Sequence, residues 1–262
     1  MASGERDLSK LIDKLDLILE VRDARAPKLT SSPTIKRISK LRPVMVVLSK
    51  RDLASEEATV AWLEHFESAG TKAWAFNLKN AKLESMLKTL VKLRPPHREL
   101  RLAVVGIPNV GKSFFLNLLV GKNVAPVGGI PGITRGVSWY KGNGFLAVDS
   151  PGILDPHGGE EIQRQLSWLG CTKTEVIGGY EFMGLHLIDF LRKKNLLNIL
   201  ENKWDIKQQE VYEAQEVLKQ IGVRLGCLVQ GGNINMELAG RKLIESFSTG
   251  KLGSVTIEYP DD

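Results

Sequence analysis

The size and composition of this chain are those of an ordinary globular protein. It has 262 residues, of which 43% are hydrophobic and 25% charged, enough for one core and a smaller second domain. Two cysteines, Cys171 and Cys227, exclude a disulfide scaffold, and with neither a targeting segment nor an apolar run of about 18 residues a cytoplasmic protein is expected. The net charge of +6 is uneven, with +9 on residues 1–156 and −3 on residues 157–262, which suggests either a phosphate-rich partner or a solvated basic surface around a nucleotide site.

Strands and helices alternate through the first 150 residues. Apolar runs lead into loops of functional character, which favours an α/β fold with a mostly parallel sheet covered on both faces. Pro95 and Pro96 interrupt the pattern, and residues 94–98 are interpreted as a linker. Strands are predicted at 17–21, 44–48, 73–76, 102–105 and 145–148, and helices at 6–16, 55–69, 81–93 and 112–120.

The pattern changes after about residue 160. Helical periodicity dominates from there, and only the tail at 255–260 has an extended character. The sequence therefore predicts two domains, an α/β domain at 1–160 and a small all-helical domain at 161–262 that is a candidate for RNA binding. The helices of the second domain are predicted at 160–170, 175–193, 207–221 and 234–248.

A phosphate-binding loop follows the strand at 102–105. The segment from Gly106 to Ser113 matches G-x-x-x-x-G-K-S, in which backbone N–H groups and the following helix N-terminus surround phosphates. Lys112 supplies a positive charge near the β and γ phosphates, and the hydroxyl of Ser113 is a ligand for Mg²⁺. The residues expected to contact the nucleotide here are Pro108, Asn109, Val110, Gly111, Lys112, Ser113 and Phe114.

A second group of residues completes the predicted phosphate and metal site. Asp149 ends the strand at 145–148 and is expected to hold Mg²⁺, directly or through water. The N–H of Gly152 is expected to bond the γ phosphate. Thr134 is the candidate switch residue, because its hydroxyl can complete the Mg²⁺ coordination only while the γ phosphate is present.

A base-reading motif comes earlier in the chain. Ser49-Lys50-Arg51-Asp52 is a variant of N-K-x-D, and the Asp52 carboxylate can accept hydrogen bonds from both donors on the guanine edge. Adenine lacks this pair of donors, so GTP and GDP are favoured over adenine nucleotides. The stem of Lys50 is expected to cover the base. The next strand ends in Asn77, Leu78 and Lys79, where the Leu78 N–H can reach guanine O6 and Lys79 can pack on the base.

The order of these motifs predicts a circular permutation. A Ras-like domain begins with the phosphate loop and ends with the base-reading motif, whereas here the base-reading motif comes first. The place of the water-orienting glutamine after D-x-x-G holds Ile153, so intrinsic hydrolysis is expected to be slow. Lys112, Thr134 and Asn109 are the candidate catalytic residues.

The rotated order, the segment Asp23-Ala24-Arg25-Ala26-Pro27 and the Pro108-Asn109 pair resemble the YlqF/RbgA family of circularly permuted GTPases. The resemblance covers nearly the whole chain. It implies a GTPase that matures the large ribosomal subunit, contacts ribosomal RNA through its helical domain, and is stimulated by the ribosomal particle and by potassium. Asn109 is similar to an asparagine that holds K⁺ in several GTPases, and the alternative is that it only caps the loop.

The chain also departs from that family. The N-terminal histidine stretch implicated in catalysis is missing, since the four histidines are His65, His97, His157 and His186. The favoured hypothesis is a cytoplasmic, monomeric GTPase that cycles on and off the large ribosomal subunit. One rival is a signalling switch whose helical domain binds a protein, and another is an RNA-binding scaffold that senses GTP but barely hydrolyses it.

Overall fold

The computed structural model describes residues 11–32, 34–35, 39–121, 138–149, 159–173, 177–206 and 213–261. The chain divides into two compact units. The first, here called the sheet unit, comprises Met1–Pro156 and Thr256–Asp262, and the second, the helical unit, comprises His157–Val255. The predicted division after residue 160 assigned the tail to the helical domain, whereas residues 256–261 pack on the sheet unit because their side chains and backbone bond there.

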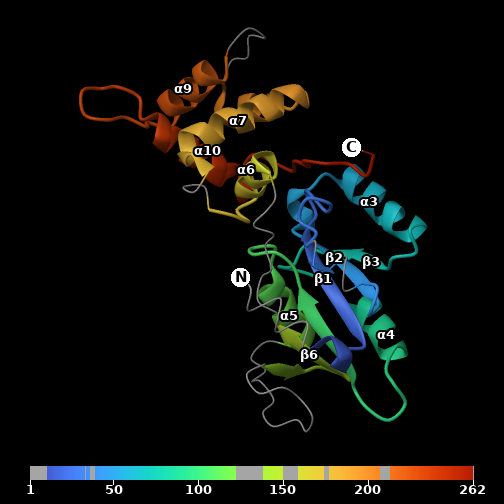
Figure 1. Cartoon of the computed structure of the whole chain (residues 1–262). Coiled ribbons are helices and arrows are strands. Elements are labelled where there is room, and N and C mark those ends of the chain that lie inside the picture. Colours follow the sequence, from blue (N-terminus) through green and yellow to red (C-terminus); the bar gives the residue numbers. More distant parts are fainter. Residues whose placement is uncertain are drawn as a thin grey trace. The chain divides into compact units, whose positions relative to one another are not determined.

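The sheet unit is built on one mixed sheet, in which all neighbouring strands but the last pair are parallel (Figure 1). The mostly parallel sheet predicted from the apolar runs is thus confirmed. The antiparallel edge strand β5 was not predicted, since three residues are too few to show a period. The order is β3 (Ala73–Ala75), β2 (Val44–Ser49), β1 (Leu17–Asp23), β4 (Leu100–Val105), β6 (Phe145–Asp149) and β5 (Trp139–Lys141).

Strand β1 lies at the centre of this sheet. It pairs with β2 on one side and with β4 on the other, and six of its seven residues are buried. Ile18 lies opposite Val44 and Ala103 in these two registers. A central parallel strand is covered on both faces, which explains why it is apolar without alternation.

Helices accompany the sheet, and Figure 1 shows α3 beside β3 and α5 beside β6. The helix α3 (Glu56–Ser68) begins where the Ser55 hydroxyl accepts the N–H of Ala58, a standard helix cap. Two short 3₁₀ turns lie at Ile12–Lys14 and Arg51–Leu53. A helix was predicted at 6–16, and within its described part, from residue 11 on, the chain forms the first of these turns. The other helices of this unit are α4 (Glu84–Lys92) and α5 (Lys112–Val120).

The helical unit contains α6 (Glu160–Trp168), α7 (Gly179–Lys193), α8 (Asn198–Trp204), α9 (Ala214–Arg224) and α10 (Met236–Ser248). Helices α7 and α10 make the most extensive contact, and Gly184 and Gly240 face each other at their crossing. Helix α8 was not predicted, because its seven residues offer only Leu200 and Trp204 as a buried pair. No helix within the described ranges is long and apolar enough to cross a membrane.

Candidate functional site

The sheet topology brings the predicted motifs to one edge. Strands β1, β2, β4 and β6 run parallel, so their carboxyl ends lie on the same side of the sheet. The base-reading motif follows β2, the phosphate loop follows β4, and Asp149 ends β6. Ligands of open parallel sheets bind at this edge, where the loops meet.

The conformation of the phosphate loop depends on its glycines. A Cβ on Gly106 would lie 2.4 Å from the carbonyl oxygen of Val21 in β1, so only glycine fits there. Gly111 has a positive φ of 95° and starts α5. The buried Lys112 donates from Nζ to the Ile107 carbonyl at 2.8 Å, which holds its ammonium group inside the loop. Asn109, at φ 61°, lies exposed on the loop.

Two of the three predicted magnesium ligands lie side by side. The Ser113 hydroxyl donates to Asp149 Oδ2 at 3.4 Å, and Asp149 Oδ1 is buried with no hydrogen-bond partner among the described residues. Burial raises the pKa of the Asp149 carboxyl above its ordinary value, against the lowering effects of Lys112 and the Ser113 hydrogen bond. A carboxylate and a hydroxyl beside a phosphate loop are the ligand types that Mg²⁺ takes, so these residues fit the ion.

The base-reading motif is tied to the phosphate loop by its first residue. Ser49 is fully buried, and its hydroxyl lies 2.9 Å from the Arg22 carbonyl and 2.6 Å from the Val110 carbonyl, close enough to donate to either. Lys50 adopts a left-handed conformation with φ 54°, and the 3₁₀ turn that follows carries Asp52 with an exposed side chain. A small hydroxyl at the first place of the motif therefore links two loops that are far apart in the sequence.

The segment predicted to contact the other side of the base lies next to this loop. The Arg51 N–H donates to the Phe76 carbonyl at 3.2 Å, and the Lys79 N–H donates to the side-chain oxygen of Asn77 at 3.1 Å. The buried Leu78 approaches the phosphate loop, since a Cβ on Gly111 would lie 3.1 Å from Leu78 Cδ1. This segment therefore lies next to the base-reading motif through Phe76 and next to the phosphate loop through Leu78.

The structure also reveals a buried ionic cluster that the sequence reasoning did not assign. Asp23, at the end of β1, is fully buried and accepts from Arg25 Nη2 at 2.8 Å, while Lys50 Nζ lies 2.9 Å from the same carboxylate oxygen, Oδ2. Burial opposes ionisation, but the two cations hold the pKa of Asp23 far below its usual range. The D-A-R-x-P motif at Asp23–Pro27 could have pointed to this cluster, but it indicated only the family resemblance.

Several predicted residues lie outside the described part of the chain. Thr134, Gly152, Ile153 and His157 belong to this set, so their expected roles stay predictions. Within the described ranges no group of three or more His, Cys, Asp or Glu side chains gathers as a metal cluster. The predicted magnesium site would differ from such a cluster, because it uses a single carboxylate with hydroxyl and phosphate oxygens as further ligands.

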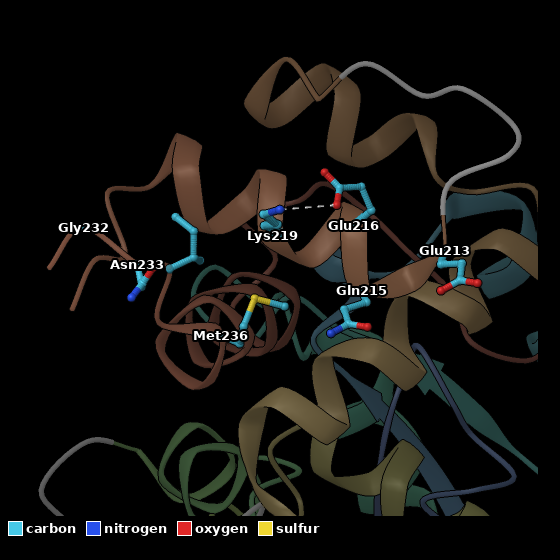
Figure 2. A pocket seen from close by; sticks show the side chains of 8 residues that line it. Glu213, Gln215, Glu216, Lys219, Gly232, Asn233 and Met236 are labelled. Carbon is cyan, nitrogen blue, oxygen red and sulfur yellow. Dashed lines mark ion pairs between the residues drawn. The ribbon is translucent and has the colours of Figure 1, made fainter. Parts of the chain in front are cut away.

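A separate cavity of about 740 Å³ lies in the helical unit, lined by α9 and the loop before α10. Figure 2 shows Lys219 next to Glu216, with which it forms an ion pair of 3.8 Å. None of the predicted site residues lines this cavity. Its lining residues are Glu213, Gln215, Glu216, Lys219, Gly232, Asn233, Ile234 and Met236.

Comparison with known proteins yields consistent matches. A family described as 50S ribosome-binding GTPase matches residues 101–222. Ribosome biogenesis GTPase A of Bacillus licheniformis is 32% identical over 100% of this chain and 96% of its own length. The protein of that name from Thermotoga maritima is 29% identical over 99% and 92% of the two chains. The crystal structure of GNP-bound YlqF from T. maritima superimposes with a TM-score of 0.73 at 26% identity, covering 99% of each chain.

Proposed function

The chain belongs to the ribosome biogenesis GTPase A family, and on that premise we propose that it is a GTP-hydrolysing assembly factor for the large ribosomal subunit. The observation that carries the proposal is the gathering of the phosphate loop, the base-reading motif and Asp149 at one edge of a parallel sheet. The relatives share this chain's full length and carry ribosome biogenesis in their names, so the signalling-switch alternative is not favoured.

Guanine recognition is assigned to the two loops beside the phosphate loop. The exposed Asp52 carboxylate accepts the two donors of the guanine edge, and the Lys50 stem lies along the base. The Leu78 N–H and Lys79 serve the opposite side. Lys112 holds the β and γ phosphates together with the backbone N–H groups of the loop.

The proposed metal is Mg²⁺, held by Ser113, Asp149 and Thr134. An ion held by these residues would supply positive charge to stabilise the negative charge that develops on the phosphates during hydrolysis. The orphaned Asp149 Oδ1 supports this assignment, because a buried oxygen with no partner among the described residues is suited to a metal ion or to its water. Gly152 and Thr134 are assigned to sensing the γ phosphate.

Hydrolysis is proposed to depend on the particle. Ile153 stands where Ras-like enzymes carry a water-orienting glutamine, so the protein by itself lacks that group at that place. Asn109, exposed in the phosphate loop, presents an amide oxygen suited to K⁺, and a cation there would stabilise the charge of the transition state. The ribosomal particle is proposed to supply the remaining stabilisation.

Contact with ribosomal RNA is proposed to involve the basic sheet unit and a local patch on the helical unit. Lys193, Lys194 and Lys251 are exposed. Lys242 donates instead to the Leu225 carbonyl at 2.8 Å, and the Arg241 guanidinium lies 4.8 Å from the centre of the Tyr180 ring. Phosphate contacts need a side chain that the RNA can reach, so exposure favours these three lysines over the half-buried Lys242. We further propose a monomeric protein that works in the cytoplasm.

The test is GTP hydrolysis in potassium buffer, alone, with purified large ribosomal subunits, and with small subunits as a control. We expect a slow basal rate, stimulation by large subunits only, and a lower rate when sodium replaces potassium. The Lys112→Ala variant should show no turnover under any condition, which controls for contaminating GTPases.

The rival functions give different outcomes in the same assay. A slow rate unmoved by either subunit, with no binding to RNA, would support a protein-partnered switch. Salt-sensitive RNA binding without turnover would support the scaffold. Full turnover by Lys112→Ala would overturn the phosphate-loop assignment itself.

A further inference from the structure

We propose that the C-terminal segment Thr256–Tyr259, here called the strap, is part of the guanine-binding end of the sheet unit. The strap holds the loop at 24–30, here called the β1 loop. This loop orients Asp23, and Asp23 positions Lys50. The inference rests on the proposed guanine-reading role of Lys50 and Asp52. It assigns positioning roles to Asp23 and Glu258, neither of which touches the nucleotide in the proposed function.

The strap makes hydrogen bonds to several parts of the sheet unit. The Ile257 N–H donates to the Arg25 carbonyl at 2.8 Å, and the Thr256 hydroxyl accepts the Ser55 N–H at 2.9 Å. Trp62 Nε1 donates to the Glu258 carbonyl at 3.1 Å. Figure 1 shows the C-terminal end running beside α3, the helix that carries Trp62. Backbone and side-chain groups of consecutive strap residues are thus bonded to the sheet unit.

Glu258 makes the contact that bears directly on the β1 loop. Its Oε1 accepts the backbone N–H of Lys28 and that of Leu29, the latter at 2.9 Å. One carboxylate oxygen therefore satisfies two adjacent donors of a turn, and a charged acceptor makes stronger hydrogen bonds than a neutral one. Loss of this carboxylate would free the outer end of the β1 loop.

The inner end of the β1 loop is closed on Asp23. The Asp23 N–H donates to the Thr30 hydroxyl at 3.0 Å, and that hydroxyl donates to the Ala26 carbonyl at 2.6 Å. The Arg25 N–H donates to Asp23 Oδ1 at 3.1 Å. The carboxylate of Asp23 is therefore oriented by the same loop that the strap holds.

Asp23 in turn holds the base-reading motif. Its Oδ2 pairs with Lys50 Nζ at 2.9 Å, and the Ala24 N–H donates to the Ser49 carbonyl at 2.9 Å. Lys50 precedes the 3₁₀ turn that carries Asp52, and its left-handed backbone leaves that turn dependent on outside support. The contacts thus run without a gap from Glu258 through the β1 loop and Asp23 to Lys50.

The experiment measures discrimination between two nucleotides that differ at the guanine edge. Inosine diphosphate lacks the exocyclic amine that is proposed to donate a hydrogen bond to Asp52. The ratio of the GDP affinity to the inosine diphosphate affinity therefore reports that contact alone. Affinities are measured by competition against a fluorescent GDP analogue on the full-length protein. We expect Glu258→Ala to reduce this ratio about three- to tenfold, the size of one misplaced hydrogen bond.

Three further variants separate positioning from a general loss of stability. Glu258→Gln keeps an acceptor oxygen and should restore most of the ratio. Asp261→Ala removes an exposed carboxylate from the same tail and should leave the ratio unchanged. Trp62→Phe keeps a ring in the core but removes the Nε1 hydrogen bond to the strap, and should lower the ratio in the same direction as Glu258→Ala.

The outcomes distinguish this inference from the proposed function. If Glu258→Ala leaves the ratio unchanged, even with both affinities reduced, the positioning role is overturned. The guanine assignment would still stand in that case, provided that Asp52→Asn abolishes the preference for GDP. If the wild-type protein binds GDP no better than inosine diphosphate, and Asp52→Asn does not change this ratio, the guanine assignment is overturned together with this inference.

Discussion

Asp149 illustrates how a single residue can be placed for function at a cost in stability. Its Oδ2 accepts from Ser113, its Oδ1 has no partner in the described part of the chain, and burial raises the pKa of its carboxyl. A raised pKa means that the folded state favours the neutral form, so the ionised carboxylate lowers stability at neutral pH. Such a group is expected where a cation binds.

We therefore expect Asp149→Asn to raise the melting temperature of the nucleotide-free protein at pH 7 in the absence of Mg²⁺. The free-energy gain should not exceed about 1 kcal/mol, because a half-buried carboxylate is screened by solvent. It should shrink as the pH falls through the raised pKa, since the wild-type carboxyl is then also neutral.

The same variant should lose Mg²⁺-dependent GTP binding, which can be measured by titration with and without the ion. Asn117→Ala, at an exposed position of α5, is the matched control and should bind GTP with the same dependence on Mg²⁺ as the wild type. An Asp149→Asn protein that is less stable than wild type without Mg²⁺ would contradict the electrostatic argument.

The crossing of α7 and α10 shows how an element-scale contact depends on two glycines. A Cβ on Gly240 would lie 2.1 Å from the Tyr180 carbonyl oxygen, and a Cβ on Gly184 would lie 3.1 Å from Gly240 Cα. The first distance is a clash and the second a tight contact, and both involve backbone atoms that a side-chain rotation cannot move away. The two helices can approach this closely only because neither carries a side chain at the crossing.

Gly240→Ala should therefore force α7 and α10 apart and destabilise the helical unit by about 1–3 kcal/mol, the usual range for overpacking. Thermal unfolding followed by circular dichroism measures the loss. Glu245→Ala, at an exposed position of the same helix, is the matched control and should change little. Wild-type stability in Gly240→Ala would show that the helices can shift at small cost.

The rotated motif order requires the chain to connect segments of the sheet unit that are not connected in a Ras-like domain. Arg98, in the predicted linker, makes two hydrogen bonds to the Asp16 carboxylate at 2.6 and 2.7 Å, and the Arg101 N–H adds a third at 2.9 Å. Asp16 directly precedes β1 and Arg98 shortly precedes β4, the strands that pair at the centre of the sheet. The pair thus connects the two segments that enter the sheet side by side.

Burial opposes ionisation of Asp16, but the bonds from Arg98 and Arg101 outweigh it and lower the pKa of its carboxyl. A lowered pKa means that the pair stabilises the fold above the ordinary pKa of the carboxyl and that this stability is lost as the pH falls. We expect Asp16→Asn to cost about 0.5–1 kcal/mol at pH 7, since the pair is partly exposed.

The cost should begin to diminish below about pH 4, where the carboxyl of the unfolded chain becomes protonated. It should vanish only once the pH falls below the lowered pKa of the folded state. Denaturant unfolding at pH 7 and pH 3 provides the measurement. Asp13→Asn, whose carboxylate is exposed and lies 3.8 Å from Arg42, is the control and should show little effect at either pH. A deficit of equal size at both pH values would indicate a packing defect instead of a lost ion pair.

Elements and motifs with local signals can be predicted from the amino-acid sequence alone. The strands at β1, β2, β4 and β6, the phosphate loop from Gly106 to Ser113, and the rotated motif order all follow from short runs of residues. Short elements such as β5 and α8 escaped prediction because three and seven residues carry too little periodic signal.

Contacts between residues far apart in the sequence become visible only in the folded chain. The Ser49 hydroxyl reaches Val110 across 61 positions of the chain, and Glu258 reaches Leu29 across 229. The buried Asp23 was identified as part of a motif, but its pairing with Lys50 depends on the adjacency of β1 and β2 in the sheet. Local patterns specify helices, strands and turns, whereas the contacts between loops arise from packing of the whole sheet unit, which no short segment encodes.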